Sequence, residues 1–160
     1  MKALSLWQPW ASACALELKQ NETRHWFLPY RGTIAIHAAK RPICAVGAAL
    51  FKDYEYEFAQ LGVMQLNEFP LGAVLCVCQI GKGQRTSSAT NLSVRERDFG
   101  DYSQGRYFYP LSQVRRFLKP VPAKGAQGLW NWDESAGGFC VPGACFKKED
   151  PDQAVMEFLK

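Results

Sequence analysis

Two short runs typical of β-strands constrain the fold of this chain more than any other feature. The run 33–38 alternates, with Ile34 and Ile36 on one face of an extended backbone and His37 on the other. The run Gly72–Ile80 is almost continuously apolar and indicates a buried strand. Short strands of this kind, mixed with two or three helices, predict an α+β domain whose sheet closes on itself.

Further elements are predicted around these two strands. Residues 3–7 are typical of a strand, and the apolar spacing over 10–18 predicts an amphipathic helix. Residues 45–61 and 152–159 also favour helices. Pro120–Pro122 is expected to lead the chain away from the sheet.

Composition and charge narrow the class of protein. The chain is 48% hydrophobic and 21% charged, as in ordinary globular proteins, and no repeat or linker divides it, which predicts one domain over residues 1–160. The longest apolar stretch is too short to cross a bilayer, and the start lacks the apolar core of a secretory signal. We therefore expect a cytoplasmic protein without membrane contact. The formal charge of +4 permits contact with a polyanion but does not predict it.

The cysteines are interpreted as reduced thiols rather than as disulfides or metal ligands. Most of them lie among Ala, Val, Leu and Ile, where a thiol behaves as a small hydrophobe. No CxxC pair is present, and the ligand spacing of a structural zinc site is absent, so we expect no metal and no other cofactor. The six are Cys14, Cys44, Cys76, Cys78, Cys140 and Cys145.

Four segments together resemble a known family. They are LSLWQPWA at 4–11, KQNETRHW at 19–26, YRGTIAIHAAK at 30–40 and GLWNW at 128–132. In this order and at these separations they are similar to the ASCH domain, the activating-signal-cointegrator homology domain, and the resemblance covers nearly the whole chain. It implies a PUA-like fold, a small mixed β-barrel with flanking helices, and a cleft between the first helix, the ETR segment and neighbouring loops.

The resemblance also implies a ligand. PUA-like relatives place RNA or a modified base in this cleft, so the expected partner is RNA or a modified nucleoside, with DNA and the oligomeric state left open. Some ASCH members are enzymes: one branch hydrolyses the amide of acetylated cytidine with a lysine, a threonine and a glutamate, and ribonuclease activity is attributed to another. Lys19 matches that lysine, whereas the threonine position falls on Glu22, with Thr23 one place later. A small nucleoside amidohydrolase or ribonuclease using the same cleft is therefore the alternative.

Six residues are candidates for ligand contacts. Glu22 and Arg24 are two apart, so an extended segment places them on one face, where the carboxylate would accept from a base and the guanidinium would hold phosphate. Trp26 comes next along that face and offers a stacking surface, and Trp10, after a proline turn, would also stack on a base. The ligand-binding set is Trp10, Lys19, Glu22, Arg24, His37 and Lys40, and the catalytic set of an enzyme would be Lys19, Glu22 and His37.

These candidates also have structural interpretations. Glu22 and Arg24 would form a surface ion pair of little energetic value. Lys19 would lie in the last turn of a helix, where a cation is favourable to the helix dipole. Trp7 and Trp132 are expected to anchor the core.

The residues also bear on two other functional classes. Ser5 and Ser12 have no histidine–acid partner at a recognisable spacing, which argues against a serine hydrolase. A protein–protein adaptor without a small ligand is the third hypothesis, and an exposed apolar patch in place of a polar cleft would indicate it.

Overall fold

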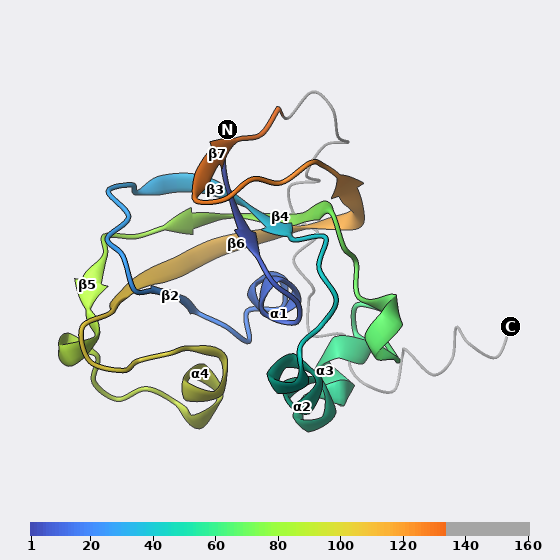
Figure 1. Cartoon of the computed structure of the whole chain (residues 1–160), viewed down its shortest axis with the longest axis horizontal. Coiled ribbons are helices and arrows are strands. Elements are labelled where there is room, and N and C mark those ends of the chain that lie inside the picture. The colour runs from blue at the N-terminus through green and yellow to red at the C-terminus, as the bar shows by residue number, and fades with distance from the viewer. Residues whose placement is uncertain (134–160) are drawn as a thin grey trace, which may run out of the picture.

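Residues 1–133, the part of the chain that the computed structural model describes, contain seven strands that belong to one mixed sheet (Figure 1). The strands are β1 Lys2–Leu6, β2 Asn21–Arg24, β3 Gly32–Ala38, β4 Ala73–Ile80, β5 Gln84–Arg85, β6 Tyr107–Pro122 and β7 Leu129–Asn131. The helices are α1 Trp10–Ala15, α2 Ala45–Asp53, α3 Glu55–Ala59 and α4 Val94–Phe99, with 3-10 turns η1 Leu66–Glu68 and η2 Thr86–Ser88. The strand order is β2-β6-β4-β3-β1-β7, and β5 pairs with β6.

The long strand β6 curls the sheet. Its first part, Tyr107–Pro110, pairs with β2, and the part from Leu111 onward pairs with β4. The register between β4 and β6 shifts twice, and such irregularities bend a strand and increase its twist. The result is a half-barrel with a few helices, which confirms the predicted α+β class and the small mixed barrel with flanking helices.

Helix α1 closes the hollow side of this sheet. Ala11 and Cys14 on α1 pack in one cluster with Leu4, Ile34 and Ile36 from β1 and β3. These isoleucines are fully buried, so the alternation predicted for this strand is confirmed.

Two further clusters complete the core. Ala35 and Val77 face the other side of the sheet and pack with Phe117 and Trp132. The cluster formed with α2, α3 and α4 is centred on Phe58, which is fully buried and contributes about 1.5–3 kcal/mol by leaving water.

Some predicted boundaries were wrong. The first helix ends at Ala15 because Glu17 adopts φ 58°, and the backbone amides of Leu18 and Lys19 then both donate to the Ala13 carbonyl. The helix expected over 45–61 is interrupted at Tyr54 and becomes α2 and α3.

Pro120–Pro122 does not leave the sheet. Val121 is buried and pairs with Val74, so β6 continues to Pro122. The helix predicted for 152–159 lies outside the described residues, and the single domain over 1–160 stays a prediction.

Candidate functional site

A groove made of two hollows runs across the ends of β1, β2 and β3. The larger hollow, about 1180 Å³, lies between these strands and the segment 122–128. The smaller hollow, about 560 Å³, lies between α1, β2 and the end of α4. Four residues line both hollows, so the two adjoin, and together they are called the groove; the four are Ser5, Trp7, Arg24 and His25.

The turn between β1 and α1 places two tryptophans at this groove. The buried Gln8 side chain holds the turn, because its amide nitrogen donates to the Pro70 carbonyl at 2.8 Å and its amide oxygen accepts from the Ser12 backbone at 3.1 Å. Trp7 is 49% exposed on one side of the turn, and the half-buried Trp10 lines the smaller hollow on the other. The prediction that Trp7 anchors the core was therefore wrong, whereas Trp132 is buried as predicted.

A buried chain of charges forms the floor of the smaller hollow. Glu22 Oε2 lies 3.6 Å from Lys19 Nζ, and Glu22 Oε1 lies 2.7 Å from Arg24 Nε. Lys19 Nζ also donates to the Phe99 carbonyl at 2.9 Å. Glu22 is 4% exposed and Lys19 2% exposed, so the expected surface ion pair is in fact a buried network. Lys19 also lies beyond the end of α1, which excludes the predicted interaction with the last turn of that helix.

Arg24 extends from this network into the groove. Its Nη2 donates to the Ser5 carbonyl at 3.4 Å, and its Cζ lies 5.7 Å from the centre of the Trp26 ring. A second cation–π pair lies nearby, with Arg41 Cζ 3.8 Å from the centre of the Trp7 ring. Indole rings and guanidinium groups are therefore side by side at the groove.

His37 lies behind Ser5 in the wall of the larger hollow. Its Nδ1 is 3.0 Å from Ser5 Oγ, and its Nε2 is 3.1 Å from the Ala123 carbonyl. Trp130 Nε1 donates to Ser5 Oγ at 3.1 Å. Burial lowers the pKa of His37 below its ordinary value, although the contact with the Ala123 carbonyl opposes this. Ser5 therefore has a histidine neighbour that its sequence spacing did not indicate, and the other nitrogen of that ring meets a backbone carbonyl rather than an acid.

The two hollows differ in charge. The described residues that line the larger hollow include the cations Arg24, Lys40 and Lys124 and no acidic side chain. The smaller hollow carries both signs, in Lys19, Glu22, Arg24, Asp98, Asp101 and Arg106. Hydrogen bonds from the Ser103 hydroxyl and amide, with Arg106 nearby, lower the pKa of Asp101, so that carboxylate is charged at neutral pH.

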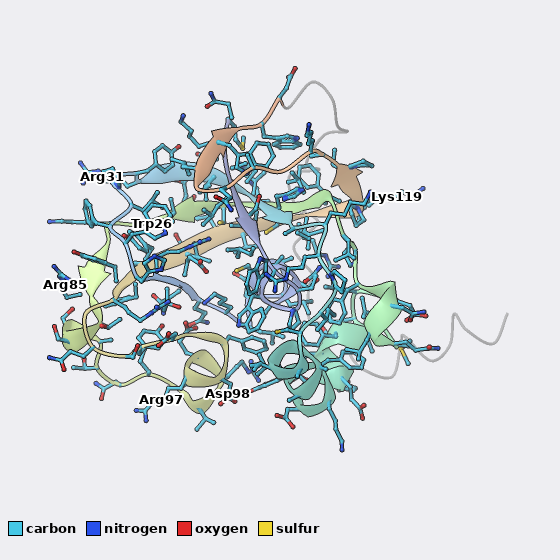
Figure 2. All side chains as sticks on the ribbon, viewed as in Figure 1. Trp26, Arg31, Arg85, Arg97, Asp98 and Lys119 are labelled. Atoms are coloured by element: carbon cyan, nitrogen blue, oxygen red, sulfur yellow. The ribbon has the colours of Figure 1, made fainter. Side chains whose placement is uncertain are left out.

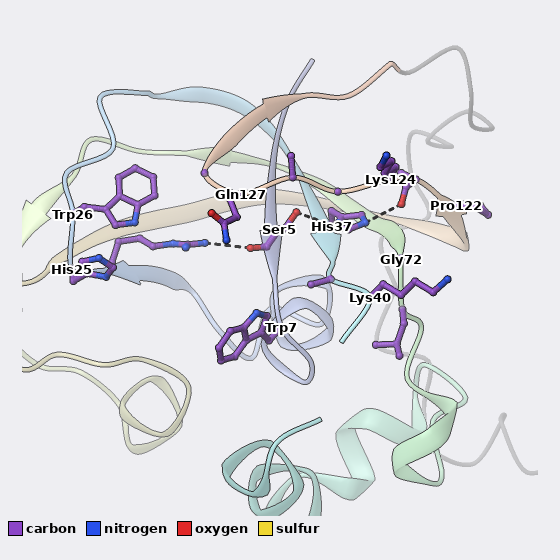
Figure 3. A pocket seen from close by; sticks show the side chains of 17 residues that line it. Ser5, Trp7, His25, Trp26, His37, Lys40, Gly72, Pro122, Lys124 and Gln127 are labelled. Atoms are coloured by element: carbon purple, nitrogen blue, oxygen red, sulfur yellow. Dashed lines mark hydrogen bonds between the residues drawn. The ribbon is translucent and has the colours of Figure 1, made fainter. Parts of the chain in front are cut away.

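The two lysines and Trp26 lie at opposite ends of the larger hollow. Figure 3 shows Lys40 and Lys124 at one end, Trp26 and His25 at the other, and Ser5 between them. In Figure 2 the Trp26 side lies toward the edge that carries Arg31 and Arg85, whereas Lys119 lies at the opposite end of the molecule. The larger hollow therefore has a cationic end, with Lys40 and Lys124, and an opposite end where Trp26 lies beside the Arg24 guanidinium.

All six predicted ligand-binding residues line this groove, although they divide between its hollows. Trp10, Lys19 and Glu22 line the smaller hollow, His37 and Lys40 line the larger one, and Arg24 lines both. The catalytic roles predicted for Lys19, Glu22 and His37 stay predictions. Sequence reasoning missed several lining residues that come from loops and strand ends, namely Ser5, Trp7, Lys124 and Gln127. Of these, Ser5 and Trp7 lie within the ASCH-like segments, which was the available signal.

No cysteine is among the described residues that line either hollow. Cys14, Cys76 and Cys78 are buried free thiols, and Cys140 and Cys145 lie outside the described residues. Within residues 1–133, no three His, Cys, Asp or Glu side chains are grouped so as to hold a metal ion. No helix in that part of the chain has both the length and the apolar character needed to span a bilayer.

Comparison with known proteins gave few matches. No protein-family model matches the chain. Activating signal cointegrator 1 of Mus musculus and of Homo sapiens are each 28% identical to it over 138 residues, which is 81% of this chain and 22% of theirs. The chain thus spans about a fifth of the length of these relatives. The crystal structure of a point mutant of the ZmASCH protein from Zymomonas mobilis has a TM-score of 0.47 and 14% identity, covering 84% of this chain and 91% of that one.

Proposed function

We propose that the chain is an ASCH domain, as its similarity to activating signal cointegrator 1 over 81% of its length supports, and that its groove binds RNA or a modified nucleoside. The observation that carries the proposal is the lining of the larger hollow, where three cations and two indole rings meet without an acidic side chain among the described residues. Cations bind the phosphate backbone, and aromatic faces accept stacked bases, so this combination suits a single-stranded or splayed nucleotide.

The positions of the lysines and of Trp26 at opposite ends of the larger hollow suggest how the ligand lies. Lys40 and Lys124 would hold phosphate at the cationic end, and Trp26 would stack on a base at the other end. Stacking of one base on an aromatic side chain is worth about 1–3 kcal/mol. Trp7 is exposed between the two hollows and offers a second stacking surface.

The role of Glu22 in binding is indirect in this proposal. Its carboxylate is already engaged by Lys19 and Arg24, and little of it faces the groove. We therefore assign Glu22 to holding Arg24, and Arg24 to contacting phosphate or ribose. Lys19, bound to the Phe99 carbonyl and beside Glu22, is better suited to fixing this network than to acting as the nucleophile of an amidohydrolase.

Binding of a short fluorescein-labelled single-stranded RNA, followed by fluorescence anisotropy over a range of salt concentrations, tests the proposal. Each phosphate contact on a single strand contributes about 0.7 to the slope of log affinity against log salt, so the double variant Lys40→Ala/Lys124→Ala should reduce that slope by about 1.4. The same RNA competed by single nucleosides and by DNA of matching sequence identifies the preferred ligand.

Matched charge controls are available on distant surfaces. Lys119 and Arg97 are exposed, line neither hollow and lie away from Trp26 in Figure 2. The double variant Arg97→Ala/Lys119→Ala removes two positive charges, as the groove double variant does, and should change affinity little. Equal losses in the control and groove variants would mean that the protein attracts RNA only through its net charge, and the proposed site would be wrong.

A further inference from the structure

Ser5 and His37 meet because two parallel strands place them in register. β1 and β3 pair in parallel, and Ser5 is the partner of His37 in that pairing although 32 residues separate them. Their side chains project to the same side of the sheet, where Ser5 Oγ lies 3.0 Å from His37 Nδ1.

The hydrogen bonds around this pair fix where its protons lie. A backbone carbonyl only accepts, so Nε2 of His37 carries the hydrogen that is donated to the Ala123 carbonyl. Burial favours the neutral ring, so Nδ1 is without a proton and accepts the Ser5 hydroxyl hydrogen. Trp130 Nε1 donates to the same oxygen from the other side, which leaves one lone pair of Ser5 Oγ.

The pair lies at the groove and close to the segment around Gly125. Ser5 is only half-buried and lines both hollows of the groove. The loop opposite approaches closely at Gly125, where an added Cβ would lie 2.3 Å from His37 Cε1 and 2.8 Å from Ser5 Oγ. A Cβ at position 125 would thus clash with the pair, and glycine lets the backbone of this segment approach it.

We propose that Ser5 is a nucleophile activated by His37 for acyl transfer, with esters and similarly activated acyl groups as the substrate class. Ser5 Oγ attacks the acyl carbon while its proton passes to His37 Nδ1. The bond to the leaving oxygen then breaks, and His37 returns the proton to that oxygen, which departs as the alcohol. A water molecule that loses its proton to His37 then hydrolyses the acyl-serine, releases the carboxylic acid and restores Ser5.

The groove also indicates which esters would fit. The Arg24 guanidinium donates to the Ser5 carbonyl at 3.4 Å, and we assign it to stabilising the oxyanion that forms during attack. Lys40 and Lys124 favour an alcohol half that bears negative charge. The third group next to Ser5 and His37 is the Ala123 carbonyl, where a catalytic triad has a carboxylate. This carbonyl fixes the tautomer of His37 but supplies no full negative charge, so turnover should be slow. Covalent labelling of Ser5 is therefore a more sensitive test than turnover.

A fluorophosphonate probe, which phosphonylates activated serines, tests this inference on the full chain. Intact-mass and peptide analysis should find one adduct, on Ser5, and none in Ser5→Ala. Loss of a general base should slow labelling by about 100-fold in His37→Gln. Ser112→Ala, which removes an exposed serine of β6, should label as the wild type does.

The outcome does not depend on RNA binding, because the probe carries no nucleotide. Absence of an adduct on Ser5 of the folded wild type between about pH 6 and pH 9, the range in which His37 can act as a base, would overturn the inference. Equal labelling of a folded His37→Gln variant would do the same. The position of the adduct on the wild-type protein decides the question even where a variant loses its fold, which thermal unfolding of each variant will show.

Discussion

Replacing Glu22 by alanine should strongly destabilise the fold, because it leaves a buried ammonium group without its counter-ion. The side chains of Glu22 and Lys19 are 6% and 2% exposed, and their charged atoms lie 3.6 Å apart. In the variant, the hydrogen-bond partner left to Lys19 among residues 1–133 would be the neutral Phe99 carbonyl. An uncompensated buried charge is far more costly than the loss of a surface ion pair.

The expected magnitude follows from burial. Removing one partner of a buried ion pair costs about 3–5 kcal/mol. For a domain of this length each kcal/mol lowers Tm by about 2–4 °C, so Glu22→Ala should unfold about 6–20 °C below the wild type. Urea unfolding followed by tryptophan fluorescence gives the free energy of unfolding directly.

Two comparisons test the reasoning. Glu57 Oε1 lies 3.8 Å from Nη2 of Arg95, whose side chain is 51% exposed, so this pair is at the surface. Glu57→Ala should therefore lower the free energy of unfolding by less than about 1 kcal/mol. The double variant Lys19→Met/Glu22→Ala removes the stranded charge and should recover most of the loss. If Glu22→Ala were as stable as Glu57→Ala, the argument that removal of Glu22 leaves a costly buried charge on Lys19 would be refuted.

Two further changes probe single buried groups. Tyr109→Phe removes the hydroxyl that accepts a hydrogen bond from the Leu28 backbone amide at 2.6 Å. The amide left without a partner should lower the free energy of unfolding in urea by about 1–3 kcal/mol. An unchanged urea midpoint would show instead that water replaces the hydroxyl. Burial lowers the pKa of His37 below 6.5, so the unfolded chain binds this proton more readily than the folded one. The wild type should therefore lose stability as the pH falls below about 6.5, and His37→Gln should lose less between about pH 7 and pH 5; parallel pH profiles would contradict this.

Local patterns predicted the strands well because burial on a strand has a short period. The alternation around Ile34 and Ile36 depends only on neighbouring residues, and these side chains are buried on one face as predicted. The spacing of Glu22 and Arg24 likewise predicted that both lie on one side of an extended segment, and Glu22 Oε1 is 2.7 Å from Arg24 Nε there. Whether that pair is at the surface or buried depends on α4, whose end supplies the Phe99 carbonyl and is remote in sequence.

The Ser5–His37 pair shows why the rest of the site could not be predicted. Its geometry depends on the parallel register of β1 and β3, and a shift of one residue would turn one of the two side chains to the other face. The exposure of Trp7 depends in the same way on tertiary contacts, because the Gln8 side chain anchors the turn to Pro70. Neither the contact between Ser5 and His37 nor the exposure of Trp7 can be predicted from spacing in the sequence.

Arg24 links the stability of the fold to the shape of the groove. Glu22 fixes its Nε, the Ser5 carbonyl accepts from its Nη2, and the Trp26 ring lies beside its Cζ, so the guanidinium is ordered before any ligand arrives. A preordered side chain loses little conformational entropy on binding, which favours affinity. Loss of Glu22 should therefore free Arg24 and weaken binding in both hollows, although the Glu22 carboxylate itself faces little of the groove.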